Sequence, residues 1–418
     1  MNKKTIFVWC LYDFANSIFY AIIPATIWSS YYANAIVGNE TGQGDLWWGR
    51  VVSTAMLLVA VTSPVMGAIA DYTGVRKRLL VVYTLLSIIG TCLLATVQPG
   101  MILWGFLLSV VAYMCVEGGL VFYNAYLPEI APADYQGRVS GWGFALGYAG
   151  SLIGLLVALP LVQNEMFKMT FLLAGLGFFL FALPALLLLP ADEPARMTAR
   201  EAASHGARGV IETFRSLRHL KQMRRFLISF FFYEDGVNTV INVAALFAAK
   251  TLGFTPAELI YLFATVQISA LVGALLWAKP TDRRGPKFVV MTMLAQWIVV
   301  VGLAYFVQTK LQFFVIAVLA GSGLGAVQAA SRAFMALLIP VGKEAEYFGL
   351  YALCGKSASV MGPILFGAVS SQTGGNQRIA ILSIIALYVI GAVLLARVQT
   401  ARAGIERFSA SRAQNGVT

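Results

Sequence analysis

Residues 67–78 read Gly67-Ala68-Ile69-Ala70-Asp71-Tyr72-Thr73-Gly74-Val75-Arg76-Lys77-Arg78 and lie between two long apolar stretches. An acidic residue closes the first stretch, a glycine permits a tight turn, and three basic residues open the second stretch. A related sequence, Asp282-Arg283-Arg284-Gly285-Pro286-Lys287, follows another apolar stretch, and its first residue comes 211 positions after Asp71. Repetition of an acid-turn-base loop at this distance indicates a chain built from two related halves.

The composition of the chain identifies lipid as its main solvent. Of its 418 residues, 59% are hydrophobic and 12% are charged, whereas a soluble domain normally carries about 25% charged residues. Apolar runs of about 20 residues recur roughly every 35 residues, and each can cross a ~30 Å hydrocarbon core as a helix. Because lipid leaves open backbone groups unsatisfied, we expect an all-α membrane protein with about twelve helices in two pseudo-symmetric six-helix bundles. The expected spans are residues 6–34, 47–70, 79–97, 102–126, 139–162, 170–190, 224–249, 256–278, 287–307, 311–335, 347–370 and 378–397.

Breaks in hydropathy divide the chain into four parts. We expect a first bundle at residues 1–190, a basic cytoplasmic linker at 191–223, a second bundle at 224–397 and a cytoplasmic tail at 398–418. The end of the linker, Val210–Lys221, is expected either to form an amphipathic helix on the membrane surface or to remain a solvated basic loop.

The net charge of +11 is distributed unevenly along the chain. If the chain alternates sides, 24 of the 30 lysine and arginine residues share the side of the N-terminus, five lie opposite, and Lys356 lies within a helix. This asymmetry predicts that both termini are cytoplasmic in a plasma (inner) membrane. The positive charge is therefore interpreted as a topology signal, and we expect no nucleic-acid partner.

The loop at residues 67–78 fits the pattern Gly-x-x-x-Asp-x-x-Gly-x-Arg-Lys and resembles the signature loop of the major facilitator superfamily. The opening Trp9-Cys10-Leu11-Tyr12-Asp13-Phe14-Ala15-Asn16-Ser17-Ile18-Phe19 resembles a narrower branch, the bacterial permeases related to yeast vacuolar amino-acid effluxers. The same branch resemblance extends to Asp235–Thr239 and Gly362-Pro363. It implies the major facilitator fold and a monomeric transporter whose helices 1, 4, 7 and 10 line a central cavity.

Asp71 and Asp282 are predicted to act as latches that move during transport. A carboxylate there can face the positive N-terminal end of a helix, with helices 11 and 5 as the expected partners. Simple helix capping by these two aspartates is the alternative. The predicted gating residues are Gly67, Asp71, Gly74, Arg76, Lys77, Asp282 and Gly285.

Ionisable residues are rare within the apolar stretches, where each is costly and usually marks a cavity or a proton relay. They are Asp13, Glu117, Glu234, Asp235 and Lys356. Several lie at helical spacing from other polar side chains and so share a face with them. The predicted substrate and proton pathway comprises Asp13, Asn16, Tyr20, Tyr113, Glu117, Asn124, Glu234, Asp235, Asn238, Asn242 and Lys356.

Proton coupling requires a buried carboxyl group that gains and loses a proton near neutral pH. Glu117 and Asp235 are the first candidates, with Asp13 next, and the alternative is a structural ion pair with Lys356. Pro24 and Gly236 are expected to interrupt their helices and free carbonyl groups for substrate, although Pro24 could also produce only a kink.

Other glycine and tryptophan residues have structural interpretations. Glycines in the expected spans 139–162 and 311–335 are predicted to permit close helix packing, and Trp47 and Trp48 to lie in an aromatic belt.

These observations favour a secondary transporter for an amino acid, short peptide or similar zwitterion, coupled to protons and working by alternating access. Export of lipid, lysolipid or amphiphilic drugs is the alternative substrate class, and a transporter-like receptor is the alternative from another class. We expect no enzyme, cofactor or metal site, since the two histidines lie in the linker and the four cysteines lack paired spacing. The sequence also lacks the phosphate-binding loop of an ATP-driven pump.

Overall fold

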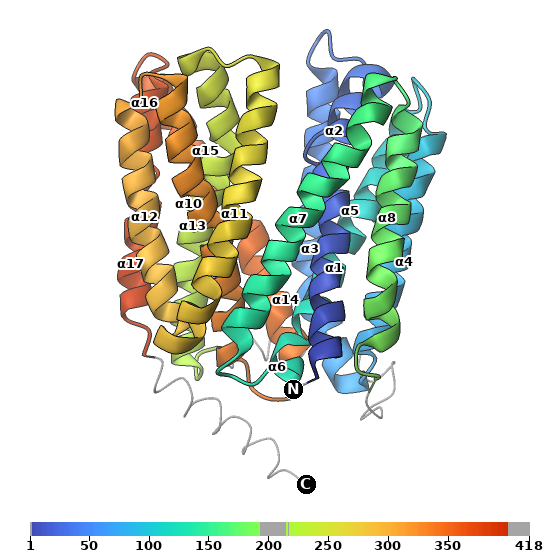
Figure 1. The fold of residues 1–418 in the computed structure, drawn as a ribbon, viewed down its shortest axis with the longest axis vertical. Helices are drawn as coiled ribbons and strands as arrows, with labels where there is room; N and C mark the ends of the chain where they lie inside the picture. The colour runs from blue at the N-terminus through green and yellow to red at the C-terminus, as the bar shows by residue number, and fades with distance from the viewer. Residues whose placement is uncertain (1, 193–214, 216, 400–418) are drawn as a thin grey trace. The chain divides into compact units, whose positions relative to one another are not determined.

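The computed structural model describes residues 2–192, 215 and 217–399, and these residues form helices and connecting loops without a strand (Figure 1). The predicted amphipathic helix at Val210–Lys221 lies outside the described residues except for its last part. Helix α10 begins at Lys221.

In the first half of the chain, the described residues form eight α-helices with two short helices of other types between them. They are α1 (Lys3–Ile22), α2 (Ile27–Tyr31), η1 (Tyr32–Val37), α3 (Gln43–Thr73), α4 (Arg76–Leu93), η2 (Leu94–Thr96), α5 (Ile102–Asn124), α6 (Leu127–Ile130), α7 (Gln136–Gln163) and α8 (Phe167–Leu188).

The residues of the second half that the structure describes form another eight α-helices. They are α10 (Lys221–Leu252), α11 (Pro256–Arg284), α12 (Pro286–Phe306), α13 (Lys310–Leu338), α14 (Glu344–Ser357), α15 (Met361–Gln372), α16 (Gln377–Leu382) and α17 (Ile385–Ala396).

These helices form two compact units, each with its own core. The N-terminal unit comprises the described residues of 1–130, 146–209 and 345–349. The C-terminal unit comprises the described residues of 131–145, 210–344 and 350–418. Each unit thus contains most of one half of the chain and a short segment from the other half.

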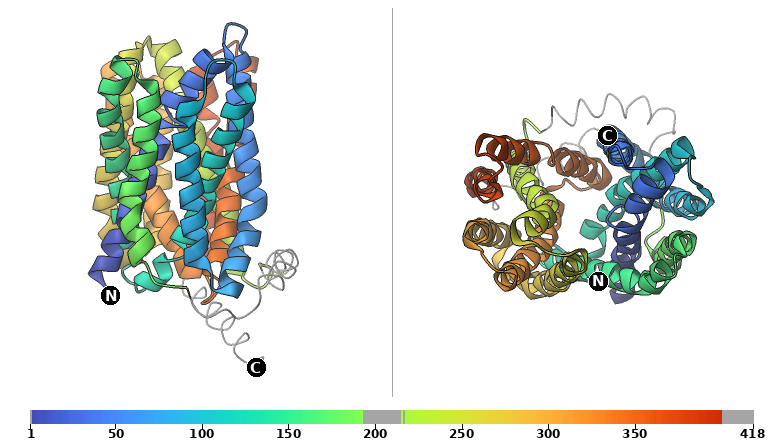
Figure 2. Two further views of the ribbon diagram at one scale, coloured as in Figure 1. Left: turned by 90° about the vertical axis from the view of Figure 1, so that its right-hand side faces the viewer. Right: turned by 90° about the horizontal axis from the view of Figure 1, so that it is seen from above.

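The same packing order occurs in both units, where neighbouring helices run side by side (Figure 2). In the N-terminal unit, α1 packs on α8, α8 on α4, α4 on α5, and α5 on α3. In the C-terminal unit, α10 packs on α17, α17 on α12, α12 on α13, and α13 on α11. Corresponding helices make corresponding contacts, which supports the duplication predicted from the repeated loops.

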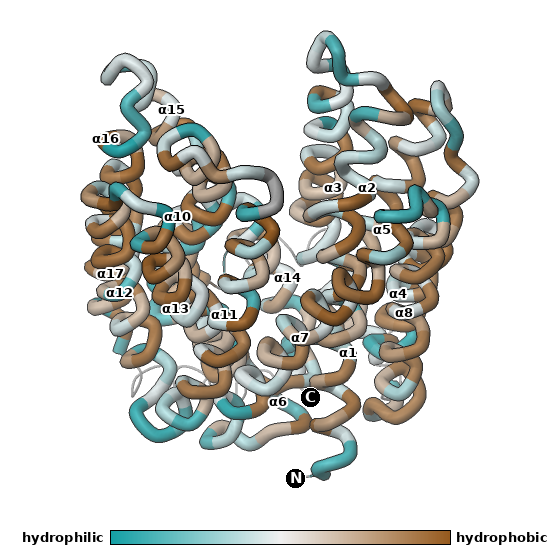
Figure 3. The backbone as a smooth tube through the Cα atoms, turned by 45° about the horizontal axis from the view of Figure 1, so that its top comes forward, coloured by the Kyte–Doolittle hydropathy of each residue, from teal (hydrophilic) through white to brown (hydrophobic). Residues whose placement is uncertain are grey.

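Hydrophobic residues cover the helices, and hydrophilic residues gather at the helix ends and loops (Figure 3). Among the described residues, eleven helical stretches are long and apolar enough to cross a membrane. Helix α10 has 32 residues and is about 48 Å long, which is also sufficient. Large side chains such as Leu57, Leu276 and Leu311 are at least 65% exposed, as expected for surfaces that face lipid.

Two expected helix interruptions have different outcomes. Helix α1 ends at Ile22, and residues 23–26 form a turn around Pro24, which has no backbone N–H to continue the helix. The expectation for Gly236 is wrong, because α10 continues through it without a break. There the missing side chain accommodates the ring of Tyr388, since a Cβ atom at Gly236 would lie 2.9 Å from that ring.

The break in the C-terminal unit lies instead between α14 and α15, at residues 358–360. Pro363 occupies the first turn of α15, a position where proline is tolerated because the first amides of a helix make no intrahelical bond. The pair Gly362-Pro363 was therefore the sequence signal for this break.

Candidate functional site

Two carboxylates lie inside the N-terminal unit. Asp13 on α1 is 7% exposed and Glu117 on α5 is 3% exposed. Neighbouring residues of α1 have roles in packing: Asn16 donates to the carbonyl of Tyr12 at 3.0 Å, and the hydroxyl groups of Tyr12 and Thr84 lie 2.7 Å apart. The predicted polar stripe on α1 is therefore partly used within the helix bundle.

Glu117 shares its surroundings with two tyrosines from the predicted pathway. Tyr113 lies one turn earlier on α5, and Tyr20 approaches from α1, with the two rings 6.3 Å apart at 71°. Both hydroxyl groups lie within electrostatic range of Glu117. Asn124 is the last residue of α5, about 10 Å further along the helix. The structure thus brings Tyr20, Tyr113 and Glu117 together and leaves Asn124 at the helix end.

Close approach of α1 and α7 depends on glycine. A Cβ atom at Gly150 would lie 2.3 Å from the carbonyl oxygen of Phe14, and one at Gly147 would lie 2.9 Å from Ser17 Oγ. In the C-terminal unit a Cβ atom at Gly325 would lie 1.9 Å from the carbonyl oxygen of Ala270. The predicted packing role of these glycines is confirmed.

Glu234 is a buried carboxylate of the C-terminal unit. It lies on α10 and is 7% exposed. Its Oε1 atom accepts a hydrogen bond from Gln328 Nε2 at 2.7 Å, and Lys356 lies within electrostatic range of the carboxylate. Its Oε2 atom is buried and has no hydrogen-bond partner among the described residues. One oxygen atom is therefore fixed and the other is available for a proton.

Asp235 has a different environment, although it is the next residue along α10. Its carboxylate is fully buried and accepts hydrogen bonds from the backbone N–H groups of Met361 at 3.0 Å and Gly362 at 3.0 and 3.1 Å. These amides belong to the open N-terminus of α15, where a negative charge is favourable. Thr239 Oγ1 also contacts the carboxylate, at 3.4 Å.

Asn238, three residues after Asp235 on α10, binds the other side of the same helix break. Asn238 Nδ2 donates at 2.8 Å to the carbonyl of Ala358, which the break between α14 and α15 releases. Asp235 and Asn238 thus satisfy backbone groups that lipid would leave unpaired. Asn242 is exposed on α10 and takes no part in this arrangement.

Asp71, in the last turn of α3, binds the start of α14 within the N-terminal unit. Asp71 accepts hydrogen bonds from the backbone N–H groups of Ala345 at 3.2 Å and Glu346 at 2.8 Å, in the first turn of α14. Arg76 pairs with the same carboxylate at 3.1 Å. Gly67 permits this approach, since its Cβ would lie 2.2 Å from the carbonyl oxygen of Ala345, and Gly74 takes a left-handed φ of 68°.

Lys77 anchors the start of α4 rather than the helix end at α14. Its backbone N–H donates to Asp192 at 2.6 Å, and its Nζ donates to the carbonyl groups of Leu187 and Leu189 at 3.0 and 2.8 Å. Among the predicted gating residues of this loop, Gly67, Asp71 and Arg76 therefore lie at the helix contact, and Lys77 lies beside α8.

The C-terminal unit repeats this geometry. Asp282 accepts hydrogen bonds from the backbone N–H groups of Gly137 at 2.7 Å and Arg138 at 3.3 Å, at the start of α7. The Arg138 side chain pairs with the carboxylate at 2.8 Å, and Gly285 takes a φ of 84° at the following turn. The partners are the starts of α14 and α7, which are the expected helices 11 and 5. Gating by either contact remains a prediction.

Arg332 is a residue that sequence reasoning passed over. It lies on α13 and is 4% exposed. It donates from Nε to Ser140 Oγ and from a terminal nitrogen to the Ser140 carbonyl, both at 2.9 Å, and its guanidinium lies 4.1 Å from the ring centre of Phe144. Together with Asp282 it binds the first turns of α7. An arginine near the C-terminal end of an apolar helix was a visible signal, but its partner could not be identified without the packing.

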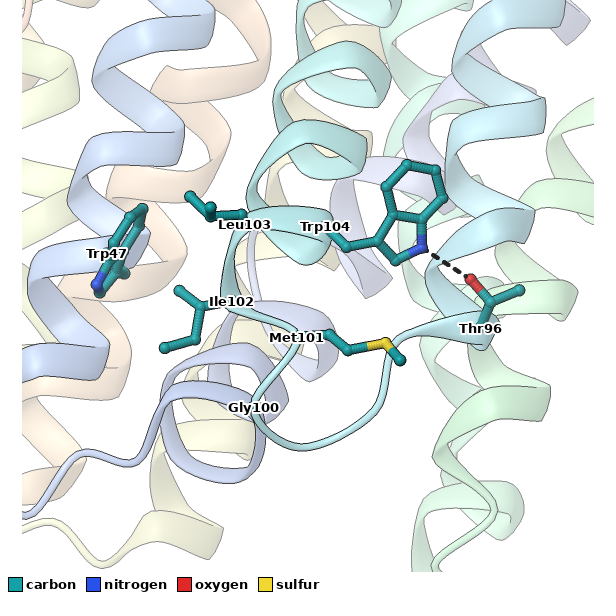
Figure 4. Close-up of a pocket in the computed structure, with 7 residues that line it drawn as sticks. All are labelled: Trp47, Thr96, Gly100, Met101, Ile102, Leu103 and Trp104. Carbon is teal, nitrogen blue, oxygen red and sulfur yellow. Dashed lines mark hydrogen bonds between the residues drawn. The ribbon is translucent and has the colours of Figure 1, made fainter.

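A surface groove in the N-terminal unit has no features of a solute site (Figure 4). It is lined by Trp47, Thr96, Gly100, Met101, Ile102, Leu103 and Trp104 at the ends of α3, η2 and α5. Trp104 Nε1 donates to Thr96 Oγ1 at 3.1 Å, and none of the lining residues is ionisable. Tryptophans beside apolar side chains at helix ends are typical of a membrane interface.

The packing of the helices within each unit corresponds to the fold of the major facilitator superfamily. Solved structures support the fold: the human organic anion transporter MFSD10 has a TM-score of 0.76 at 13% identity and covers 94% of this chain and 100% of its own. The proton:xylose symporter XylE has a TM-score of 0.73 at 14% identity, covering 96% and 97%. The predicted fold is confirmed.

The chain belongs to the vacuole effluxer Atg22 like family, whose model matches residues 50–407. YxiO of Bacillus subtilis, described as an MFS-type transporter, is 28% identical over 401 residues, which cover 93% of each chain. Autophagy-related protein 22 of Yarrowia lipolytica is 26% identical over 443 residues, covering 84% of this chain and 75% of the relative. The protein is therefore an integral membrane transporter and not an enzyme.

Proposed function

We propose that the protein is a proton-coupled secondary transporter that moves an amino acid, short peptide or similar zwitterion across the inner membrane by alternating access. The observation that carries the proposal is Glu234. Its carboxylate is buried, one oxygen is bound to Gln328, and the other has no partner among the described residues. Proton coupling requires a buried carboxyl group that can bind and release a proton.

Glu234 replaces Asp235 as the first candidate for the coupling site in the C-terminal unit. The carboxylate of Asp235 accepts hydrogen bonds from two backbone N–H groups of α15, and both favour its ionised form. Glu234 accepts one hydrogen bond and lies within range of Lys356. Glu117 remains the candidate in the N-terminal unit, where Tyr20 and Tyr113 surround it.

A zwitterionic substrate is supported by the types of polar group inside the two units. Asp13 and Glu117 supply negative charge, Lys356 supplies positive charge, and Tyr20 and Tyr113 supply hydroxyl groups and apolar ring faces. Ammonium and carboxylate groups could each be recognised by such side chains. The relationship to vacuole effluxers favours amino acids within this class.

Alternating access is proposed to use Asp71 and Asp282 as latches. Each carboxylate holds the N-terminus of a helix that comes from the other half of the chain. Such contacts are strong enough to favour one state, at about 0.3–2 kcal/mol each, and weak enough to release during a transport cycle. We further propose that both termini lie in the cytoplasm, based on the distribution of lysine and arginine. The family resemblance supports a monomer.

The proposal is tested by transport measurements on the purified full chain. Amino acids, short peptides and lysolipids are first screened for thermal stabilisation of the protein in detergent. Compounds that stabilise it are then offered to proteoliposomes with and without an imposed pH gradient. We expect a zwitterion to be transported faster with the gradient. Transport of lysolipid alone would replace the proposed substrate class, and binding without any transport would favour a receptor.

A further inference from the structure

Among the buried polar atoms of the C-terminal unit that have no hydrogen-bond partner within the described part of the chain, three lie on α10, α12 and α17. They are Glu234 Oε2, Tyr388 Oη and Trp297 Nε1. Their side chains belong to residues that are 7%, 0% and 2% exposed. Buried polar groups in native proteins are nearly always hydrogen-bonded, to protein or to ordered water. Each of these three atoms therefore calls for a partner.

The three residues come from α10, α12 and α17, and α17 packs against both of the other helices (Figure 1). The rings of Tyr388 and Trp297 are stacked, with centres 5.8 Å apart and planes at 19°. The Tyr388 ring also rests on Gly236 of α10, and Tyr388 lies within electrostatic range of Glu234. Tyr388 thus packs on both Trp297 of α12 and Gly236 of α10.

The hydrogen-bonding capacity of the three groups identifies the kind of ligand. The indole N–H of Trp297 can only donate, an ionised carboxylate can only accept, and the hydroxyl of Tyr388 can do both. A molecule that links them must accept from the indole and donate to the carboxylate. Water has this capacity and fits sites with two to four polar partners.

We propose that Glu234, Tyr388 and Trp297 enclose buried water that delivers the transported proton to Glu234 and removes it again. This proposal rests on the proton coupling proposed above and adds Tyr388 and Trp297 as residues that position the water. Neither residue was among the polar positions predicted from the sequence.

The proton transfer is a single balanced step. A hydronium ion at the water site gives one proton to Glu234 Oε2, which forms an O–H bond and becomes a neutral carboxylic acid, and a neutral water molecule remains. Release reverses the step. The other groups that face Glu234 are Gln328, which holds Oε1, and the cation Lys356. Tyr351 lies within electrostatic range of Glu234. The hydroxyl groups of Tyr233 and Ser331 lie 2.7 Å apart, and the carboxylate of Asp235 accepts a hydrogen bond from the first turn of α15.

The test compares Tyr388→Phe with wild type in proteoliposomes, using radiolabelled neutral amino acids as the probe. This variant keeps the stacked ring and removes only Oη. Because water donates to the ionised carboxylate, weaker binding of the water makes Glu234 protonate at higher pH. We expect the midpoint of the pH dependence of transport to rise by roughly 0.5–1 pH unit, as for one lost hydrogen bond. Exchange of labelled for unlabelled amino acid, without net proton flow, should stay within about twofold.

Two further variants complete the design. Tyr261→Phe is the control, since Tyr261 on α11 of the same unit is 67% exposed, and its pH profile should match wild type. Trp297→Phe keeps an aromatic ring beside Tyr388 and removes Nε1, and should shift the midpoint in the same direction as Tyr388→Phe.

An unchanged midpoint in both Tyr388→Phe and Trp297→Phe, with a wild type that responds to pH, overturns the water site. If Tyr388→Phe does not fold, the midpoint of Trp297→Phe decides. A wild type whose transport ignores the pH gradient instead refutes the proton coupling on which the inference rests, so the two failures are distinguishable.

Discussion

Glu234 and Gln328 are joined by a 2.7 Å hydrogen bond that occupies Oε1 of the carboxylate and leaves Oε2 enclosed without a protein partner in the described residues. Directly beside it on α10, Asp235 binds the N-terminus of α15 through both oxygen atoms. Two adjacent acids on one helix thus have different environments. We assign proton binding to Glu234 and support of the broken helix to Asp235.

The assignment of Asp235 is tested by stability. In Asp235→Ala the amides of Met361 and Gly362 lose their acceptor, which costs about 1–3 kcal/mol for each unsatisfied buried group. We expect the melting temperature in detergent to fall clearly and to fall less in Asp235→Asn, which keeps one acceptor oxygen. If the Asp235→Asn variant folds, its transport should still respond to a pH gradient. Loss of that response with unchanged stability would return the proton-binding role to Asp235.

The two latch contacts should have equivalent effects on transport. Asp71→Asn removes the negative charge at the start of α14, and Asp282→Asn removes it at the start of α7, each worth about 0.3–2 kcal/mol. We expect slower transport in both variants, with thermal stabilisation by bound amino acid unchanged. Asp45→Asn is a suitable control, because Asp45 is an exposed residue near the start of α3. If both latch variants transport at the wild-type rate, Asp71 and Asp282 act only as helix caps.

Close helix packing predicts a contrast between two glycines of the C-terminal unit. In Gly325→Ala the new Cβ would lie 1.9 Å from the carbonyl oxygen of Ala270, so α11 and α13 must separate. Overpacking of this kind typically costs about 1–3 kcal/mol. Gly302→Ala on α12 meets no atom within 4 Å and should be neutral or slightly stabilising. Melting temperatures measure the contrast, and equal values for the two variants would contradict it.

The sequence predicted those features that depend on short stretches of chain. Apolar length predicted about twelve membrane spans, and eleven stretches of the described residues are long and apolar enough to be such spans. The helix partners of Asp71 and Asp282 followed from the repeated loop and the family resemblance. Pro24 marked the end of α1 because proline lacks an N–H group. Each of these features is visible within a few residues, so no knowledge of helix packing was required.

Features that depend on helix packing could not be predicted. Gln328 and Tyr388 are neutral residues within helices, and only the packing of α10 with α13 and α17 reveals that Gln328 binds Glu234 and that Tyr388 lies within its electrostatic range. The break at residues 358–360 was assigned instead to Gly236, because glycine disrupts isolated helices. Tertiary packing overrides that preference in α10, where Gly236 makes room for the ring of Tyr388.

The central claim is that Glu234 couples transport to protons, and the most direct test is accumulation of labelled amino acid by Glu234→Gln proteoliposomes under an inward pH gradient. Glutamine keeps the size of the side chain and an oxygen to accept the Gln328 bond, but it cannot be protonated. We expect Glu234→Gln to exchange amino acid across the membrane yet to lose gradient-driven accumulation. The exposed control Glu40→Gln should keep both activities. Accumulation by Glu234→Gln at the wild-type level would contradict the account.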